Sequence, residues 1–169
     1  MIKQLIPEGF CLKCQGCCRF REQSSVWAPC LLDEEIQSLL DRKDIPPSTL
    51  SMERRLGLIL DPEQEGFICP FFNTKDNNCK TYSFRPFECQ LYPFLISFRE
   101  EKVLLTVDLS CPYAKKNVNT KAFKEYTSYL TDFLNSPKQR KVFKENPQII
   151  QAYAEVFDLM ELQALDEAE

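Results

Sequence analysis

Four cysteines crowd into eight residues near the start of the chain, in the pattern Cys11-x-x-Cys14-x-x-Cys17-Cys18. Two-residue spacers let a tight loop turn successive sulfur atoms toward one point, as a tetrahedral zinc ion or one face of an iron–sulfur cluster requires. Gly16 gives the loop the backbone freedom that such a turn needs. The spacing C-x-x-C-x-x-C is also the one with which bacterial ferredoxin loops hold a [4Fe–4S] cluster. The segment therefore predicts a metal-binding loop.

The two adjacent cysteines, Cys17 and Cys18, narrow the kind of metal centre. Neighbouring side chains diverge in extended backbone, so the two sulfurs do not fit comfortably on one mononuclear zinc ion. Either they serve two metal centres, or they bind different metals of one cluster. This favours an iron–sulfur cluster, of the [4Fe–4S] type, and keeps zinc as the alternative.

Cysteine is also the main candidate metal ligand in the rest of the chain, because the 169 residues include nine Cys and no His. The absence of His excludes Ser-His-Asp and Cys-His nucleophile pairs, zinc sites with imidazole ligands and two-His-one-carboxylate iron sites. Proline follows Cys69 and Cys111 and stiffens the backbone beside each sulfur, while Cys79 and Cys89 flank a compact aromatic segment. We therefore expect eight thiolate ligands: Cys11, Cys14, Cys17, Cys18, Cys69, Cys79, Cys89 and Cys111.

The ninth cysteine, Cys30, stands near Trp27 and Pro29 and is expected to be a free or buried thiol away from the metal. An odd number of cysteines fits a closed disulfide framework poorly. The first eight residues hold no apolar run typical of a signal peptide, and no stretch approaches the length of a membrane span. We expect a cytoplasmic protein without disulfides, since reducing compartments disfavour them.

The charge of the chain gives little reason to expect nucleic acid as a partner. Its 21 Lys and Arg against 25 Asp and Glu leave a net charge of −4, whereas a nucleic-acid binder normally shows a basic face. Residues 114–147 hold eight basic and three acidic side chains, and residues 155–169 hold six acidic and no basic ones. Solvated helix faces explain this division, and the alternative is a docking surface for a charged protein partner. Neither nucleic acid nor a membrane is expected to bind.

Short apolar runs separated by turn residues predict two β-hairpins. The runs 56–60 and 67–71 flank residues 61–66, which include Asp, Pro and Gly. The runs 94–98 and 103–107 flank a charged tetrapeptide in the same way. We also expect a turn between the two cysteines that follow the first hairpin, where Asn and Asp are frequent.

Helical spacing of apolar residues predicts helices at 33–42, with Asp33 as its cap, and at about 120–134. A Ser-Pro pair and an Asn-Pro pair, each a capping residue before proline, predict helix starts at 137 and 147. The last of these helices would run to about residue 160.

Together these patterns predict an α+β fold in two parts. Residues 1–113 would form a small metal-stapled domain of short hairpins and loops. Residues 114–169, which hold no cysteine, would form a C-terminal extension of two or three α-helices packed on it.

The cysteine pattern resembles that of a known family, the small bacterial proteins with a CxxCxxCC cluster that are described as a zinc- or iron-chelating domain. The resemblance covers about residues 9–113, includes the helix start at Asp33-Glu34-Glu35-Ile36, and leaves out Cys30. The other matching residues are Cys11, Cys14, Cys17, Cys18, Cys69, Cys79, Tyr82, Arg85-Pro86, Cys89, Tyr92-Pro93-Phe94 and Cys111-Pro112.

The resemblance implies metal binding and leaves activity open. Members of the family are often labelled iron–sulfur oxidoreductases, and a larger relative resembles a lysine N-methylase of flagellin. If the chain is an enzyme, the resemblance implies an iron–sulfur oxidoreductase or a methylase-related activity. The methylase activity is not carried over, because the chain has four Gly and no glycine-rich nucleotide-binding loop.

Arg85 is a candidate for a supporting role at the metal centre. Several thiolates around one or two metals leave excess negative charge, which a nearby guanidinium would offset while donating hydrogen bonds to sulfur. The alternative is a surface arginine or one paired with a carboxylate. Tyr82 and Tyr92 are expected to be core aromatics and not catalytic groups.

Three functions remain open at this stage. The first is a redox or catalytic protein with one or two iron–sulfur clusters, and the second is a zinc-stabilised interaction module whose charged helices meet a protein partner. The third is a metal-handling protein without catalysis, which requires exchangeable thiolates. Measuring iron, sulfide and zinc in the purified protein separates them.

Overall fold

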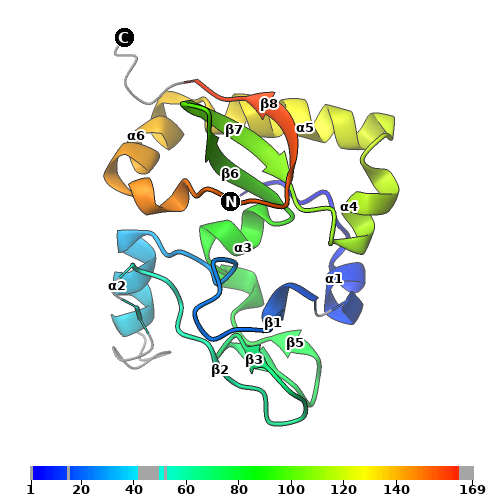
Figure 1. Cartoon of the computed structure of the whole chain (residues 1–169), viewed down its shortest axis with the longest axis vertical. Coiled ribbons are helices and arrows are strands. Elements are labelled where there is room, and N and C mark those ends of the chain that lie inside the picture. Colours follow the sequence, from blue (N-terminus) through cyan, green and yellow to red (C-terminus); the bar gives the residue numbers. More distant parts are fainter. Residues whose placement is uncertain (1, 15, 42–49, 52, 164–169) are drawn as a thin grey trace. The chain divides into compact units, whose positions relative to one another are not determined.

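The computed structural model divides into two compact units, Met1–Gln90 and Leu91–Glu169, which are described separately (Figure 1). Both units contain helices and small antiparallel sheets, so the α+β prediction is confirmed. Cys111 and the hairpin around residue 100 belong to the second unit. The structure describes residues 2–14, 16–41, 50, 51 and 53–163.

A three-stranded antiparallel sheet lies at the centre of the first unit. Its middle strand, β3 (Phe67–Ile68), pairs with β2 (Ile59–Leu60) and with β1 (Arg19–Phe20), in the order β1-β3-β2. The predicted first hairpin is therefore confirmed. Gly66, in the hairpin turn, has a φ of 117°, and a Cβ there would lie 2.7 Å from the Phe20 carbonyl oxygen. Only glycine fits this close approach without strain.

The second cysteine-bearing segment continues from this sheet. A short ladder joins β4 (Phe72–Asn73) to β5 (Asn78–Cys79), and Asn77 has a φ of 50° in the expected turn between them. A 3-10 turn, η3 (Tyr82–Phe84), and the short helix α3 (Phe87–Leu91) follow. These elements place Cys79 and Cys89 at opposite ends of one compact segment.

The predicted helix after residue 32 is confirmed as α2 (Asp33–Asp41), and residue 42 lies outside the described residues. Asp33 is not its cap, because the helix already begins at Asp33. The Glu35 carboxylate instead accepts a 2.9 Å hydrogen bond from the backbone N–H of Leu32. Glu35, the third residue of the helix, thus accepts a hydrogen bond from the backbone N–H of the residue before the helix. This is one of the two hydrogen bonds of a capping box.

Apolar side chains from several short elements form the core of the first unit. Cys69 belongs to this core, and Cys18 and Cys79 pack against it half-buried. Three of the eight predicted ligands thus lie in or against one apolar cluster, whose other members are Leu31, Leu39, Leu56, Ile68, Phe71 and Phe72.

The second unit is built around the sheet β6-β7-β8. The predicted second hairpin is confirmed as β6 (Phe94–Arg99) and β7 (Lys102–Val107), joined through Glu100 and Glu101, which have positive φ values of 50° and 63°. This left-handed two-residue turn matches the twist of the paired strands.

Three helices of the second unit follow the hairpin: α4 (Pro112–Asn117), α5 (Lys121–Leu134) and α6 (Pro137–Glu145). Thr120 caps α5 by accepting a hydrogen bond from the Phe123 backbone N–H. The Phe123 ring lies 5.0 Å from that of Phe94 in β6, so α5 packs on the sheet. The predicted C-terminal helices are thus present.

The last predicted helix is wrong. After the Asn-Pro pair the chain makes only one 3-10 turn, η4 (Pro147–Ile149), and then forms the edge strand β8 (Phe157–Glu161) against β7. Cross-strand ion pairs reinforce the strand, with Arg99 to Asp158 at 3.1 Å and Lys102 to Glu161 at 2.7 Å. Pairing with a strand distant in sequence overrides the local helical spacing.

Within the part of the chain that the structure describes, no helix has the length and apolar character that crossing a bilayer would take.

Candidate metal centre

The N-terminal cysteine cluster is built from two helical turns. Cys11 and Cys14 lie three residues apart on α1 (Glu8–Cys14), which places them on one face of the helix. Cys17 and Cys18 belong to the 3-10 turn η1 (Gly16–Cys18). Cys14 and Cys17 are exposed, whereas Cys11 and Cys18 are half-buried.

A backbone hydrogen bond connects this cluster to the second motif. The N–H of Cys69 donates to the carbonyl of Cys18 at 3.0 Å, directly beside the β1–β3 pairing of Arg19 with Ile68. The sheet thus fixes the register between the two cysteines. Cys69 is 8% exposed, so its sulfur faces the protein interior.

Cys79 reaches the same region from β5, where it pairs with Phe72. Its sulfur lies 3.3 Å from the Thr81 hydroxyl, and the Lys80 N–H donates to the Phe71 carbonyl at 2.8 Å. The β4–β5 ladder therefore brings Cys79 toward Cys69.

Cys89 lies in the middle of α3 and is half-buried. The adjacent Glu88 carboxylate accepts a 2.6 Å hydrogen bond from the backbone N–H of Cys30, and the Phe87 N–H donates at 2.6 Å to Glu35 of α2. Two carboxylates therefore anchor the short helix that carries Cys89.

Thiols of the first unit raise one another's pKa values. The pKa of Cys89 is raised well above its ordinary value by burial and then by Cys69, Cys17, Glu88 and Cys79. The pKa of Cys69 is raised to about 12, mainly by burial and further by Cys79 and Cys17. Both thiols are therefore protonated near neutral pH without a metal.

The two adjacent thiols, Cys17 and Cys18, which form the vicinal pair, differ in how readily they lose a proton. The pKa of Cys17 falls to about 7, chiefly because the Cys18 thiol hydrogen-bonds to it, while partial burial of its sulfur opposes the shift. The same hydrogen bond, together with burial, raises the pKa of Cys18, and the charges of Cys17, Cys69 and Cys89 add to this. One member of the pair thus ionises far more readily than the other.

The structure accordingly brings together five of the eight predicted ligands: Cys17, Cys18, Cys69, Cys79 and Cys89. Among the described residues, no three Cys, Asp or Glu side chains converge as closely as the ligands of one metal ion do. Thiolates are the donors that both zinc and iron–sulfur clusters prefer, so this set fits either.

Cys30 and Cys111 have surroundings that differ from those of the five grouped cysteines. Cys30 is 0% exposed and forms a β-bridge with Arg55, and burial followed by Glu88 raises its pKa to about 12. Cys111 is buried in the second unit just before α4. The groups that act on Cys30 are carboxylates and a guanidinium, in contrast to the thiol neighbours of Cys69 and Cys89.

Arg85 lies over the ring of Tyr82, with 4.3 Å between the guanidinium carbon and the ring centroid. It donates a 2.5 Å hydrogen bond to the side-chain oxygen of Gln4, whose amide donates to the Gln90 carbonyl at 3.1 Å. After the Cys18 hydrogen bond and backbone effects, its positive charge also helps to lower the pKa of Cys17. Arg85 thus faces both an aromatic ring and a thiol of the vicinal pair.

Sequence reasoning missed several residues that support these cysteines. Gln4, Glu35 and Glu88 each form hydrogen bonds with partners far along the chain, and no local pattern shows such contacts. In the second unit, Asp108 accepts hydrogen bonds from the Tyr92 hydroxyl at 2.8 Å and from the Ser110 N–H at 2.7 Å, just before Cys111. The Asp-x-Ser spacing, typical of an Asx-turn, is the one signal that could have indicated Asp108.

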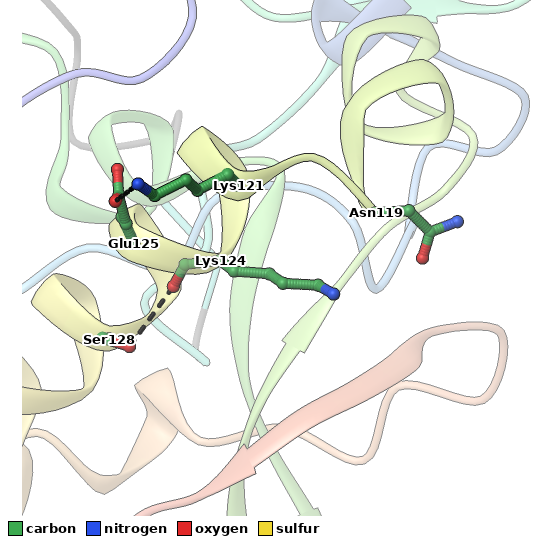
Figure 2. A pocket seen from close by; sticks show the side chains of 5 residues that line it. All are labelled: Asn119, Lys121, Lys124, Glu125 and Ser128. Atoms are coloured by element: carbon green, nitrogen blue, oxygen red, sulfur yellow. Dashed lines mark hydrogen bonds and ion pairs between the residues drawn. The ribbon is translucent and has the colours of Figure 1, made fainter.

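A surface hollow of about 470 Å³ in the second unit lies beside the start of α5 (Figure 2). Lys121 forms an ion pair with Glu125 at 3.6 Å, and the Lys124 side chain extends toward Asn119. The Ser128 hydroxyl donates to the Lys124 carbonyl at 3.3 Å. No predicted ligand lines this hollow, and its side chains offer no thiol chemistry.

The chain belongs to the CxxCxxCC family, described as "Putative zinc- or iron-chelating domain", which matches residues 10–112. Metal binding is the property that this family assigns to the cysteine set. The chain is also 29% identical over 102 residues to the uncharacterized protein MJ0661 of Methanocaldococcus jannaschii. That match covers 59% of this chain and 52% of the relative, so the chain spans about half of the relative's length. No solved structure matches the chain.

Proposed function

We propose that the protein holds an iron–sulfur cluster through cysteine thiolates and acts in electron transfer. The observation that carries the proposal is the grouping of Cys17, Cys18, Cys69, Cys79 and Cys89 in the first unit of a chain without histidine. A vicinal pair within this group suits a centre with several metal atoms, since each sulfur can bind a different iron. Cys11 and Cys14 on α1 complete the proposed ligand set of the first unit. We also propose Cys111, in the second unit, as a metal ligand.

Arg85 supports this proposal because its positive charge helps to lower the pKa of Cys17, an exposed member of the group. Thiolates around a cluster carry excess negative charge, and a neighbouring guanidinium stabilises it. The stacking of Arg85 on Tyr82 and its hydrogen bond to Gln4 fix the place of that charge. We therefore assign Arg85 a role in tuning the centre and not in ligating it.

Anaerobic purification followed by elemental analysis, sulfide determination and visible absorption tests the proposal. Iron and acid-labile sulfide in similar amounts, with a broad visible band that dithionite bleaches, are the expected result. A colourless anaerobic protein without iron overturns it. Stoichiometric zinc without sulfide, unaffected by oxygen, would assign the same thiols to a zinc-stabilised module.

The charged helices of the second unit suggest where a protein partner would bind. Lys121 and Lys141 of α5 and α6 are largely exposed, although each has an acidic residue four positions away. We propose this face as the contact for an acidic partner protein, on the ground of charge alone. Loss of a salt-sensitive association in the variant Lys121→Glu/Lys124→Glu, with unchanged metal content, is the expected result. We also propose a cytoplasmic location, because a reducing compartment keeps cysteines as thiols that can bind metal.

A further inference from the structure

Glu35 joins the beginnings of two helices that are far apart in the sequence. One carboxylate oxygen accepts a 2.9 Å hydrogen bond from the N–H of Leu32, before α2, and the other accepts a 2.6 Å hydrogen bond from the N–H of Phe87, the first residue of α3. Amide groups at helix starts have no partner within their own helix. The single side chain of Glu35 therefore satisfies one such amide at each helix.

A second carboxylate crosses the same gap in the opposite direction. Glu88 of α3 is 9% exposed and accepts a 2.6 Å hydrogen bond from the backbone N–H of Cys30, two residues before Leu32. Segment 30–35 and the start of α3 thus exchange carboxylate–amide hydrogen bonds. Hydrogen bonds to a charged acceptor are about twice as strong as neutral ones, so this crossed pair fixes the distance and orientation of the two segments.

The helix α3, to which Glu35 is hydrogen-bonded, is too short to be stable by itself. With five residues, α3 is scarcely longer than one hydrogen-bonded turn, and helices of this length are not stable alone in water. Its direction must therefore come from tertiary contacts. Cys89 lies two residues after Phe87, so a shift of the start of α3 moves the Cys89 sulfur with it.

We propose that Glu35 is a positioning residue of the metal centre, which fixes α3 through the Phe87 N–H and so sets the approach of Cys89 to the other thiols. This inference rests on the proposed metal-binding function. Burial raises the pKa of the Glu35 carboxyl and the two amide hydrogen bonds oppose that shift, so the fold keeps a carboxylate where its burial is unfavourable. The two hydrogen bonds that the Glu35 carboxylate oxygens accept explain this burial better than packing does, since packing alone would favour an apolar side chain.

Three variants separate positioning from stability. Glu35→Ala removes both acceptors, Glu34→Ala removes an exposed carboxylate from the same helical turn, and Leu58→Ala opens a cavity at a buried residue of the first unit. The readouts are the iron or zinc content of anaerobically purified protein, the half-time of metal release to excess EDTA, and the unfolding midpoint. Glu35→Ala is expected to retain its metal about 10–100-fold less well than the wild type, as is typical when support for a ligand is lost. Glu34→Ala and Leu58→Ala are expected to release metal at the wild-type rate, although Leu58→Ala unfolds more easily.

A double variant tests the route through Cys89. In Cys89→Ser the ligand is already lost, so adding Glu35→Ala is expected to leave metal release unchanged from the single Cys89→Ser variant. If Glu35→Ala does not fold, Glu35→Gln, which keeps one acceptor oxygen, takes its place in the same comparison. Wild-type release in both Glu35 variants overturns the inference, and so does an additive effect in the double variant. A wild-type protein without metal overturns the proposed function itself, which keeps the two failures distinct.

Discussion

The backbone N–H of Cys69 donates a 3.0 Å hydrogen bond to the carbonyl of Cys18, which joins the two cysteine motifs of the chain. The pairing of Arg19 with Ile68 continues directly from this bond, so a small sheet sets the register of the two motifs. The placement of these proposed metal ligands therefore depends on a hairpin that itself carries none of them. Five predictions follow from this arrangement and its surroundings, besides the test of Glu35.

The hairpin that sets this register depends on Gly66. Substituting alanine would place a Cβ 2.7 Å from the Phe20 carbonyl oxygen at a φ of 117°, so we expect Gly66→Ala to lose about 1–3 kcal/mol of unfolding free energy. Urea denaturation measures the loss. Gly9→Ala is the matched control, because nothing lies within 4 Å of its added Cβ and alanine favours a helix by about 0.5–1 kcal/mol. Equal effects of the two substitutions would contradict the close approach.

Cys30 and Cys89 should respond differently to substitution. Cys30 is buried and its pKa is raised to about 12, chiefly by burial, so it remains a neutral thiol that packs like a small apolar group. We expect Cys30→Ala to keep the wild-type metal content and to lose about 0.5–3 kcal/mol of stability. Cys89→Ser is expected to lose metal. Elemental analysis of both variants measures their metal content. Metal loss in Cys30→Ala would place that thiol among the ligands.

Metal binding should release protons. Burial raises the pKa of Cys69 to about 12 and that of Cys89 well above its ordinary value, so both thiols are protonated at pH 7 in the metal-free protein. Because the metal replaces these protons, affinity should rise by about tenfold per pH unit for each proton released. Titration of metal-free protein with zinc between pH 6 and pH 8, with a dye that reports proton release, measures the slope. Cys30→Ala should have the wild-type slope, and a pH-independent affinity would refute the displacement of protons.

Removing Arg85 should make Cys17 a weaker acid. The hydrogen bond from Cys18 is the largest cause of its lowered pKa of about 7, and the positive charge of Arg85 adds to it. We therefore expect the pKa of Cys17 to rise in Arg85→Ala, which slows its alkylation near neutral pH in metal-free protein. Mass spectrometry of the Cys17 peptide over a pH series measures this. Arg21→Ala removes the same charge from an exposed position, and an equal shift there would indicate a diffuse charge effect.

Removal of the metal should loosen the first unit more than the second. The five grouped cysteines lie in or directly after strands of two residues and helical turns of three and five residues, whereas α5 has fourteen residues packed on a sheet. Short elements of this kind are stable only when cross-linked or packed. Hydrogen exchange of the metal-free protein should therefore rise chiefly within residues 1–90. Equal increases in α5 and in the β1–β3 region would show that the metal does not hold the first unit in particular.

Local sequence patterns predicted the elements that local chemistry controls. Thr120 caps α5 because its hydroxyl reaches an amide only three residues away, and the turn at Glu100 and Glu101 joins two strands of adjacent apolar runs. Residues 157–161 show the limit of this reasoning. Pairing with β7 overrode their helical spacing, and this contact involves residues fifty or more positions earlier, which no local window contains.

The sequence by itself determined the donor chemistry of this protein: thiolates without imidazole, in a spacing that a metal requires. Only the tertiary structure decided which thiols meet, because β1 and β3 pair although they are far apart in the sequence and Glu35 reaches α3 from α2. It also placed Cys30 against Arg55 and Glu88. The physical reason is that spacing constrains neighbouring backbone alone, whereas hydrogen bonds and burial select among the many ways in which distant segments can come together.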